Sequence, residues 1–248
     1  MDILSYLIGL QRGKSMGGGG DPDSVPADKY FEGGYAEVSL PNATKIKQYA
    51  FYQDKTLVDI SMPKVESIGN YAFYQCSNLA LASLPDGITS IGTSVFASCA
   101  NLALTSLPSG VTALGVSAFY GCKNLALTSL PSGMTSIGNK AFENCSNIAL
   151  TSLPSGLKSI GNSSFWNCKK LAITSIPSGV ASIDSSAFYG CTGITSLTFK
   201  GKPNKLDAYA FQQCTNLTTI NVPWAEGEVA GAPWSATNAT INYNYTGE

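Results

Sequence analysis

Residues 99–121 read Cys-Ala-Asn-Leu-Ala-Leu-Thr-Ser-Leu-Pro-Ser-Gly-Val-Thr-Ala-Leu-Gly-Val-Ser-Ala-Phe-Tyr-Gly, and a closely similar phrase begins again at Cys122. The chain has seven cysteines spaced 23 residues apart, each with a phenylalanine three positions before it and an aliphatic residue three positions after it. They are Cys76, Cys99, Cys122, Cys145, Cys168, Cys191 and Cys214. Self-similarity at such a period is typical of a solenoid, whose units bury their apolar faces by stacking on one another. The sequence therefore predicts a single elongated repeat domain.

Each repeat unit contains signals for three short elements. Ser106-Leu107 reads as a strand that Pro108 ends, and Val111 to Leu114 alternates apolar and polar residues like a second strand. In several units a capping type of residue precedes the Ala-Phe pair, which predicts about one and a half turns of helix ending near the cysteine. These residues are Asn70, Thr93, Asn139, Asn162 and Ser185. The predicted unit is strand, turn, strand and helical turn.

Composition divides the chain into four segments, with the solenoid predicted over residues 35–223. Residues 17–34 are rich in Gly, Asp and Pro and read as a linker and N-terminal cap. The phrase stops at Pro223, so residues 224–248, which contain Trp224 and Trp234, are expected to cap the last repeat.

Residues 1–16 predict a short amphipathic helix. Ile3, Leu4, Leu7 and Ile8 share helical spacing and are candidates for docking on the solenoid or on an assembly partner. A frayed terminus is the alternative. Asp2 stands where a secretion signal carries positive charge, so no such signal is recognised. The apolar run is shorter than the roughly 20 residues that cross a bilayer, so membrane insertion is not expected.

Charge argues against nucleic acid and membrane surfaces as partners. The chain carries 15 basic and 16 acidic residues, a formal net charge of -1, and no block of one sign. Such a chain offers no field that gathers phosphates or anionic lipid. Its 44% hydrophobic residues suffice for a packed core.

The residue types argue against catalysis. The chain contains no histidine, which excludes a cysteine-histidine nucleophile and the usual serine triad. Evenly spaced cysteines form a column about 4.8 Å apart along the stack, whereas a disulfide needs Cβ atoms roughly 3.5 to 4.5 Å apart. Zinc needs four ligands converging on one point, which a column does not provide. We expect the cysteines to be small buried core residues, with no catalytic residue, metal site or cofactor.

We call one position followed through successive repeats a column. The most informative column in which the repeats differ is the position directly after each phenylalanine. It reads Tyr52, Tyr74, Ala97, Tyr120, Glu143, Trp166, Tyr189 and Gln212. A turn that buries phenylalanine should point its next residue outward, and exposed aromatic rings are enriched at protein contacts. Tyr52, Tyr74, Tyr120, Trp166 and Tyr189 are therefore the candidate ligand-binding residues. The alternative is that each ring lies flat over its neighbour and shields the core.

The phrase Ile-Gly-x-x-Ala-Phe-x-x-Cys-x-Asn-Leu, with Leu-Pro following, resembles the leucine-rich repeats of treponemal and BspA-like bacterial surface antigens. The resemblance extends from Glu37 to Pro223. It implies a right-handed, curved α/β solenoid of short strands and helical turns, and a role in attachment or protein binding.

This resemblance leads to the expectation of a non-catalytic scaffold that recognises a protein or surface glycan at a bacterial surface. The alternative is a structural component of a phage tail or other assembly, anchored by the N-terminal helix. Ile3 to Gly9 with the glycine tract behind it, and Gly227 to Tyr243, resemble tail-associated proteins of phages of gut bacteria. The expected location is extracellular, at the cell surface or on a virion, and a cytoplasmic location stays open.

Overall fold

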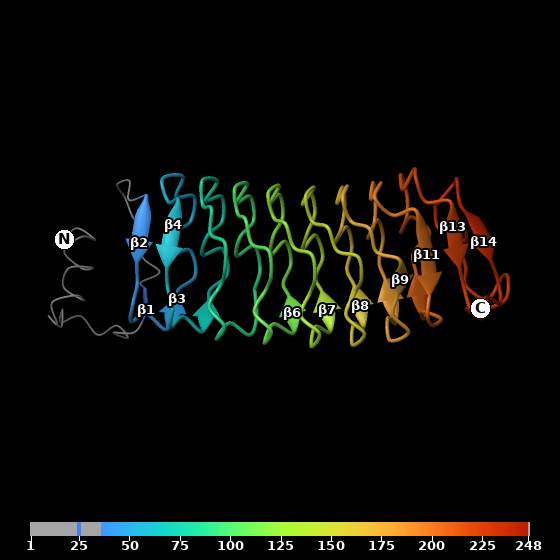
Figure 1. Ribbon diagram of the computed structural model, residues 1–248, viewed down its shortest axis with the longest axis horizontal. Helices are drawn as coiled ribbons and strands as arrows, with labels where there is room; N and C mark the ends of the chain where they lie inside the picture. The colour runs from blue at the N-terminus through green and yellow to red at the C-terminus, as the bar shows by residue number, and fades with distance from the viewer. Residues whose placement is uncertain (1–23, 26–35, 248) are drawn as a thin grey trace, which may run out of the picture.

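The computed structural model describes residues 24–25 and 36–247, which form a solenoid of short parallel strands stacked along one axis (Figure 1). Two strand columns run along it, and paired strands lie one repeat apart in sequence. The candidate docking residues Ile3, Leu4, Leu7 and Ile8 lie outside the described residues.

The first strand column consists of two-residue strands that end at an aliphatic residue, in most repeats the one before the glycine of the repeated phrase, such as Gly138. One sheet is formed by β1 (Ser24–Val25), β3 (Lys45–Ile46) and β5 (Ser67–Ile68), and another by β6 (Ala113–Leu114), β7 (Ser136–Ile137), β8 (Ser159–Ile160), β10 (Ser182–Ile183) and β12 (Lys205–Leu206). A single bridge from Ile91 to Leu114 extends the second sheet by one repeat. From β3 onward the apolar residue of each strand in this column is buried, and the strand expected over Val111 to Leu114 forms at its last two residues, as β6.

The second strand column is continuous only toward the two ends. It contains β2 (Glu37–Ser39) and β4 (Asp59–Ser61), then β9 (Ser175–Ile176), β11 (Ser196–Phe199), β13 (Thr219–Asn221) and β14 (Thr240–Asn242).

The strand predicted at Ser106-Leu107 does not form, although the equivalent residues form β9 three repeats later. Proline follows this position in most repeats and has no N–H to donate across the sheet. Lys200 stands in place of proline after β11, and its N–H donates to the carbonyl of Ile176 at 2.9 Å. The one exception in the proline column thus supplies a hydrogen bond that extends the ladder.

The segments between the Ile-Gly pair and the cysteine are runs of tight turns, and no helix is present in the described part of the chain. The N–H groups of Ser117, Phe119 and Gly121 donate to carbonyls of the next repeat at 2.7 to 2.8 Å, while the N–H groups between them close turns within their own repeat. Ser117 and Gly121 also have φ of 55° and 70°, in the left-handed region. Every second N–H group donates to the next repeat, so the consecutive i to i−4 backbone hydrogen bonds of the predicted helical turn cannot form. Nothing in the described residues is a helix able to span a membrane.

The predicted capping role is also wrong for two asparagines. The Oδ1 atoms of Asn70 and Asn139 accept hydrogen bonds from the N–H groups of Thr93 and Asn162, each at 2.9 Å. Each donor lies one repeat further along the chain. These side chains therefore join neighbouring repeats instead of starting a helix in their own repeat.

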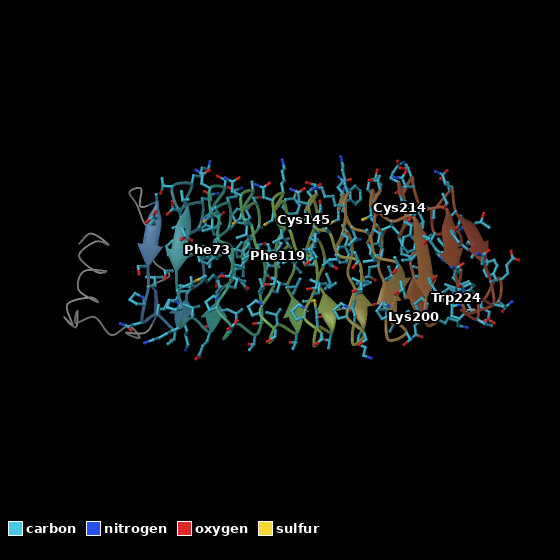
Figure 2. The ribbon with its side chains drawn as sticks, in the orientation of Figure 1. Phe73, Phe119, Cys145, Lys200, Cys214 and Trp224 are labelled. Atoms are coloured by element: carbon cyan, nitrogen blue, oxygen red, sulfur yellow. The ribbon has the colours of Figure 1, made fainter. Side chains whose placement is uncertain are left out.

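The core is a column of stacked phenylalanine rings with the cysteine thiols beside it. Consecutive ring centroids lie 5.1 to 5.6 Å apart, and every ring is buried. The rings are Phe51, Phe73, Phe96, Phe119, Phe142, Phe165, Phe188 and Phe211. Figure 2 shows Phe73 and Phe119 in the interior and Cys145 and Cys214 closer to one long edge. The expectation that the cysteines are buried core residues is confirmed.

The stack continues past Pro223, where the repeated phrase ends. Trp234 is fully buried at the next place in the phenylalanine column, and its carbonyl accepts the Phe211 N–H at 3.1 Å. The indole Nε1 donates to the carbonyl of Ala230 at 3.0 Å. Because β14 also pairs with β13, residues 224–247 add a further turn of the solenoid.

Candidate binding surface

The five candidate aromatic residues lie on the turn segments and are partly exposed. Tyr52 is 37% exposed, and Tyr74, Tyr120, Trp166 and Tyr189 are half-buried. Each follows a buried phenylalanine whose backbone is fixed by hydrogen bonds to the next repeat. The turn therefore presents each ring at the surface while holding its base in the wall of the solenoid.

These rings form two stacked pairs and one single ring. The rings of Tyr52 and Tyr74 lie 5.1 Å apart with planes inclined by 10°, and those of Trp166 and Tyr189 lie 3.7 Å apart with planes inclined by 9°. Tyr120 stands between Ala97 and Glu143 in the column and contacts no other aromatic ring among the described residues. The rings of this column are partly exposed, and in the two pairs each ring also covers its neighbour. They do not form a continuous ridge.

Two tyrosines absent from the sequence-based candidates join the first pair. Tyr49 and Tyr71 stand two positions before the phenylalanine, stack at 5.3 Å and contact Tyr52 and Tyr74 edge-on at 5.4 and 5.9 Å. Tyr49 is 45% exposed. We call Tyr49, Tyr52, Tyr71 and Tyr74 the tyrosine cluster. Its signal in the sequence was a second column, two positions before the phenylalanine, where Tyr49 and Tyr71 replace the serine or lysine of the next five repeats.

The backbone of the cluster is strained. Tyr49 and Tyr71 have φ of 61° and 58°, a region that bulky residues rarely occupy because Cβ approaches a carbonyl oxygen. Ser94, Ser117 and Lys140 take the same conformation in later repeats. The solenoid thus imposes the conformation, and the fold itself does not require tyrosine there.

A shallow groove of about 540 Å³ crosses the turn side of four successive repeats. It is lined by Ser98, Ala100, Tyr120, Gly121, Lys123, Asn144, Ser146, Asn167 and Lys169, and we call it the central groove. The Nδ2 atom of Asn167 donates to the Oδ1 atom of Asn144 at 3.1 Å across it. Of the five predicted ligand-binding residues, Tyr120 is the one that lines this groove.

The cysteines are placed for packing and are poorly placed for chemistry. Each Sγ donates to the carbonyl of the preceding repeat's phenylalanine at 2.9 to 3.1 Å, as Cys122 does to Phe96. Burial raises the pKa of the Cys122 thiol well above its ordinary value, and it raises the pKa of Cys214 to about 12. The described residues contain no group of three or more His, Cys, Asp or Glu side chains able to hold a metal ion.

The family model of the BspA type leucine rich repeat region matches residues 29–149 and 137–229, with six copies of the repeat. The chain belongs to this family. The repeat solenoid expected from the resemblance is therefore confirmed, and proteins of this repeat class generally serve as protein-binding scaffolds.

Solved structures agree with this assignment. A leucine-rich repeat protein from Bacteroides ovatus matches with a TM-score of 0.54 at 20% identity, over 84% of this chain and 68% of that one. The leucine-rich repeat protein of Treponema pallidum matches with a TM-score of 0.53 at 27% identity, over 73% of this chain and 77% of that one. No curated protein sequence matches the chain. These findings give no support to the expected resemblance of the termini to phage tail proteins.

Proposed function

We propose that this protein is a non-catalytic scaffold that recognises a protein or a glycan at a bacterial surface. The tyrosine cluster is the observation that carries the proposal, because it gathers four aromatic rings on one exposed part of a protein-binding type of solenoid. Tyrosine combines a rigid apolar ring with a hydroxyl, which suits contact with a partner that has both apolar and polar groups.

The energetics of the cluster favour a surface role over a folding role. Stacked and edge-to-face rings contribute about 0.5 to 1.5 kcal/mol per pair beyond their buried area. Left-handed backbone costs roughly 1 to 2 kcal/mol per residue, but serine or lysine at this position carries the same cost as Tyr49 and Tyr71. Because serine and lysine occupy the same place in other repeats, the rings are better explained by what they contact outside the chain.

The absence of catalysis is supported by the state of the nucleophiles. The thiols are buried, hydrogen-bonded to carbonyls and have pKa values raised by burial, so they are neutral near pH 7. The chain has no histidine to activate a hydroxyl or a thiol.

We place the protein outside the cell or at its surface, and the resemblance to bacterial surface antigens supports this location. Residues 1–16 are proposed to dock on an assembly partner through Ile3, Leu4, Leu7 and Ile8. Removing residues 1–20 separates the two roles, since the shortened chain should keep ligand binding and lose only the docking interaction.

The decisive experiment compares the intact chain with a variant in which the four cluster tyrosines are replaced by serine. Both are titrated against immobilised bacterial surface glycans and against extracellular proteins. We expect the variant to bind at least tenfold more weakly while its circular dichroism and melting temperature show a folded solenoid. The matched control is Tyr209→Ser, because Tyr209 belongs to the same column, is 55% exposed and lies toward the other end of the solenoid. Equal binding by the variant and the intact chain, or no binding by either, would overturn the proposal.

A further inference from the structure

The central groove crosses repeats in which a residue shorter than glutamine precedes the cysteine. The position before the cysteine, or before Asp54 in the first repeat, is glutamine at Gln53, Gln75 and Gln213. In the repeats that line the groove it is Ser98, Gly121, Asn144 and Asn167. Gly121 has φ of 70°, and the other residues of this column have the same left-handed backbone. The groove is therefore a local feature of the side chains on a regular backbone, and a side chain as long as glutamine at Gly121 would narrow it.

The groove is positively charged. Lys123 and Lys169 stand at the position after the cysteine, two repeats apart, and both are exposed. Neither takes part in an ion pair with the residues that the structure describes, and no carboxylate lines the groove. Glu143, the nearest acid in the sequence, pairs with Lys140 at 3.6 Å instead. Two ammonium groups without acidic partners favour an anionic ligand.

The remaining lining suits a sugar. Tyr120 offers a half-buried ring that no other aromatic ring covers, in contrast to the stacked pairs on either side of it. After the bond between them, Asn144 keeps both of its carboxamide N–H groups, and Asn167 keeps one N–H group and its oxygen for bonds to hydroxyl groups. A pyranose ring presents an apolar C–H face and a rim of hydroxyls, which matches a flat ring beside amides. Ala100 is the one aliphatic side chain of the lining, so the groove lacks the apolar pocket that anchors a protein partner.

The two lysines occupy the same position in repeats that are two apart along the solenoid. The phenylalanine rings of the three repeats that carry Lys123, Ser146 and Lys169 follow one another at 5.6 and 5.4 Å. The two lysines therefore line the groove two repeats apart along the solenoid axis, each at the same place within its own repeat. A polymer with regularly spaced carboxylates could engage both lysines while one of its rings lies on Tyr120.

We propose that the central groove binds a carboxylate-bearing polysaccharide. A sugar ring stacks on Tyr120, the amides of Asn144 and Asn167 hydrogen-bond its hydroxyls, and Lys123 and Lys169 pair with two carboxylates of the same polymer chain. The proposal rests on the proposed function as a binding scaffold and assigns a ligand class to a second part of its surface.

The test uses the full-length chain and polygalacturonate as the probe, with dextran as a neutral polysaccharide and polyglutamate as an acidic peptide. Calorimetric titration at about 50 and 300 mM salt separates charge pairing from stacking, because exposed charges are screened at the higher concentration. We expect binding to polygalacturonate that weakens with salt, and little binding to dextran or polyglutamate. Polyglutamate that binds as tightly as polygalacturonate would overturn the assignment to a sugar.

Three variants and one control locate the site. Gly121→Gln places a longer side chain in the groove, and glutamine already occupies the same backbone conformation at Gln75, so we expect the variant to fold and to lose binding at least tenfold. Tyr120→Ala and the double variant Lys123→Ala/Lys169→Ala should each lose binding to a similar extent.

The control is the double variant Lys158→Ala/Lys200→Ala, which makes the same charge change on exposed residues outside the groove. Lys200 lies near the long edge opposite Cys145 in Figure 2. Equal loss in the control and in the groove variants would mean non-specific charge attraction and would overturn the site. Because the tyrosine cluster is intact in all of these variants, failure here is distinguishable from failure of the binding function itself.

Discussion

The indole of Trp166 lies on the phenol ring of Tyr189, with centroids 3.7 Å apart and planes inclined by 9°. The two residues occupy the same position of successive repeats, and their separation is shorter than the 5.5 Å between the buried rings of Phe165 and Phe188 beneath them. The surface rings therefore lean together over the core. This contact belongs to the interface between two repeats, which is the unit of stability in a solenoid.

We expect a coupling free energy of about 0.5 to 1.5 kcal/mol between Trp166 and Tyr189, the range found for aromatic pairs. A double-mutant cycle with Trp166→Ala and Tyr189→Ala, measured by urea unfolding, checks it. The control cycle pairs Tyr120→Ala with Tyr189→Ala, which lie three repeats apart and should be additive within about 0.5 kcal/mol. Equal coupling in both cycles would contradict a direct ring contact.

The core phenylalanines should matter far more to stability than the ring that follows them. Phe119 is fully buried between Phe96 and Phe142, so Phe119→Ala should cost roughly 3 to 5 kcal/mol. Tyr120→Ala removes a half-buried ring without a ring partner and should cost clearly less. Thermal melting measures the difference, and equal shifts would mean that Tyr120 belongs to the core. Hydrogen exchange in Phe119→Ala should be fastest in the repeats that adjoin it.

The sequence predicted the features of the fold that recur in every repeat. Phenylalanine and cysteine recur because each rung has one place for a ring and one for a small buried side chain. The same period would have located Trp234, which stands 23 residues after Phe211, had tryptophan been accepted in the phenylalanine column. Composition alone suggested a cap there, whereas packing continues the stack.

The errors arose where a local signal was satisfied by a distant partner. Asn70 and Asn139 have the side chain of a helix cap, but their hydrogen-bond donors lie 23 residues away in the chain. The pattern within one repeat does not contain that information. The tyrosine cluster and the central groove depend on comparing columns across repeats, and Gly121 matters there because of the side chain it lacks.

The glycine that follows the aliphatic strand residue in the middle repeats should be needed because neighbouring repeats approach closely there. A Cβ added at Gly138 would lie 2.6 Å from the carbonyl oxygen of Leu114, while one added at Gly133 meets nothing within 4 Å. We expect Gly138→Ala to lose about 1 to 3 kcal/mol through overpacking, since backbone atoms must shift to relieve the contact. Gly133→Ala, in the same repeat, is the matched control and should be close to neutral. Chemical denaturation of both variants checks this, and equal stability of the two would show that the repeats can separate without cost.

The seven thiols should be unreactive in the folded protein, and their ionisation should lower the free energy of unfolding at high pH. Burial raises the pKa of six of them above the ordinary value of 9.0, to about 12 for Cys214, and a hydrogen bond with Cys99, together with burial, raises that of Cys76. A thiol reagent at pH 8 should therefore label none of them until the chain unfolds.

As the pH rises above about 9, thiols of the unfolded chain ionise before those of the fold, and the unfolded state then binds fewer protons. The stability that the buried thiols contribute is thus complete below pH 9 and is lost as the pH rises toward their folded pKa values. The loss is about 1.4 kcal/mol per thiol for each pH unit. Urea unfolding at pH 8 and pH 10 measures it, and the variant Cys122→Ala/Cys145→Ala corrects for other groups that titrate in this range, because it should lose less stability between the two pH values than the intact chain. An identical loss in both proteins, or rapid labelling of the native chain, would contradict the buried column of neutral thiols.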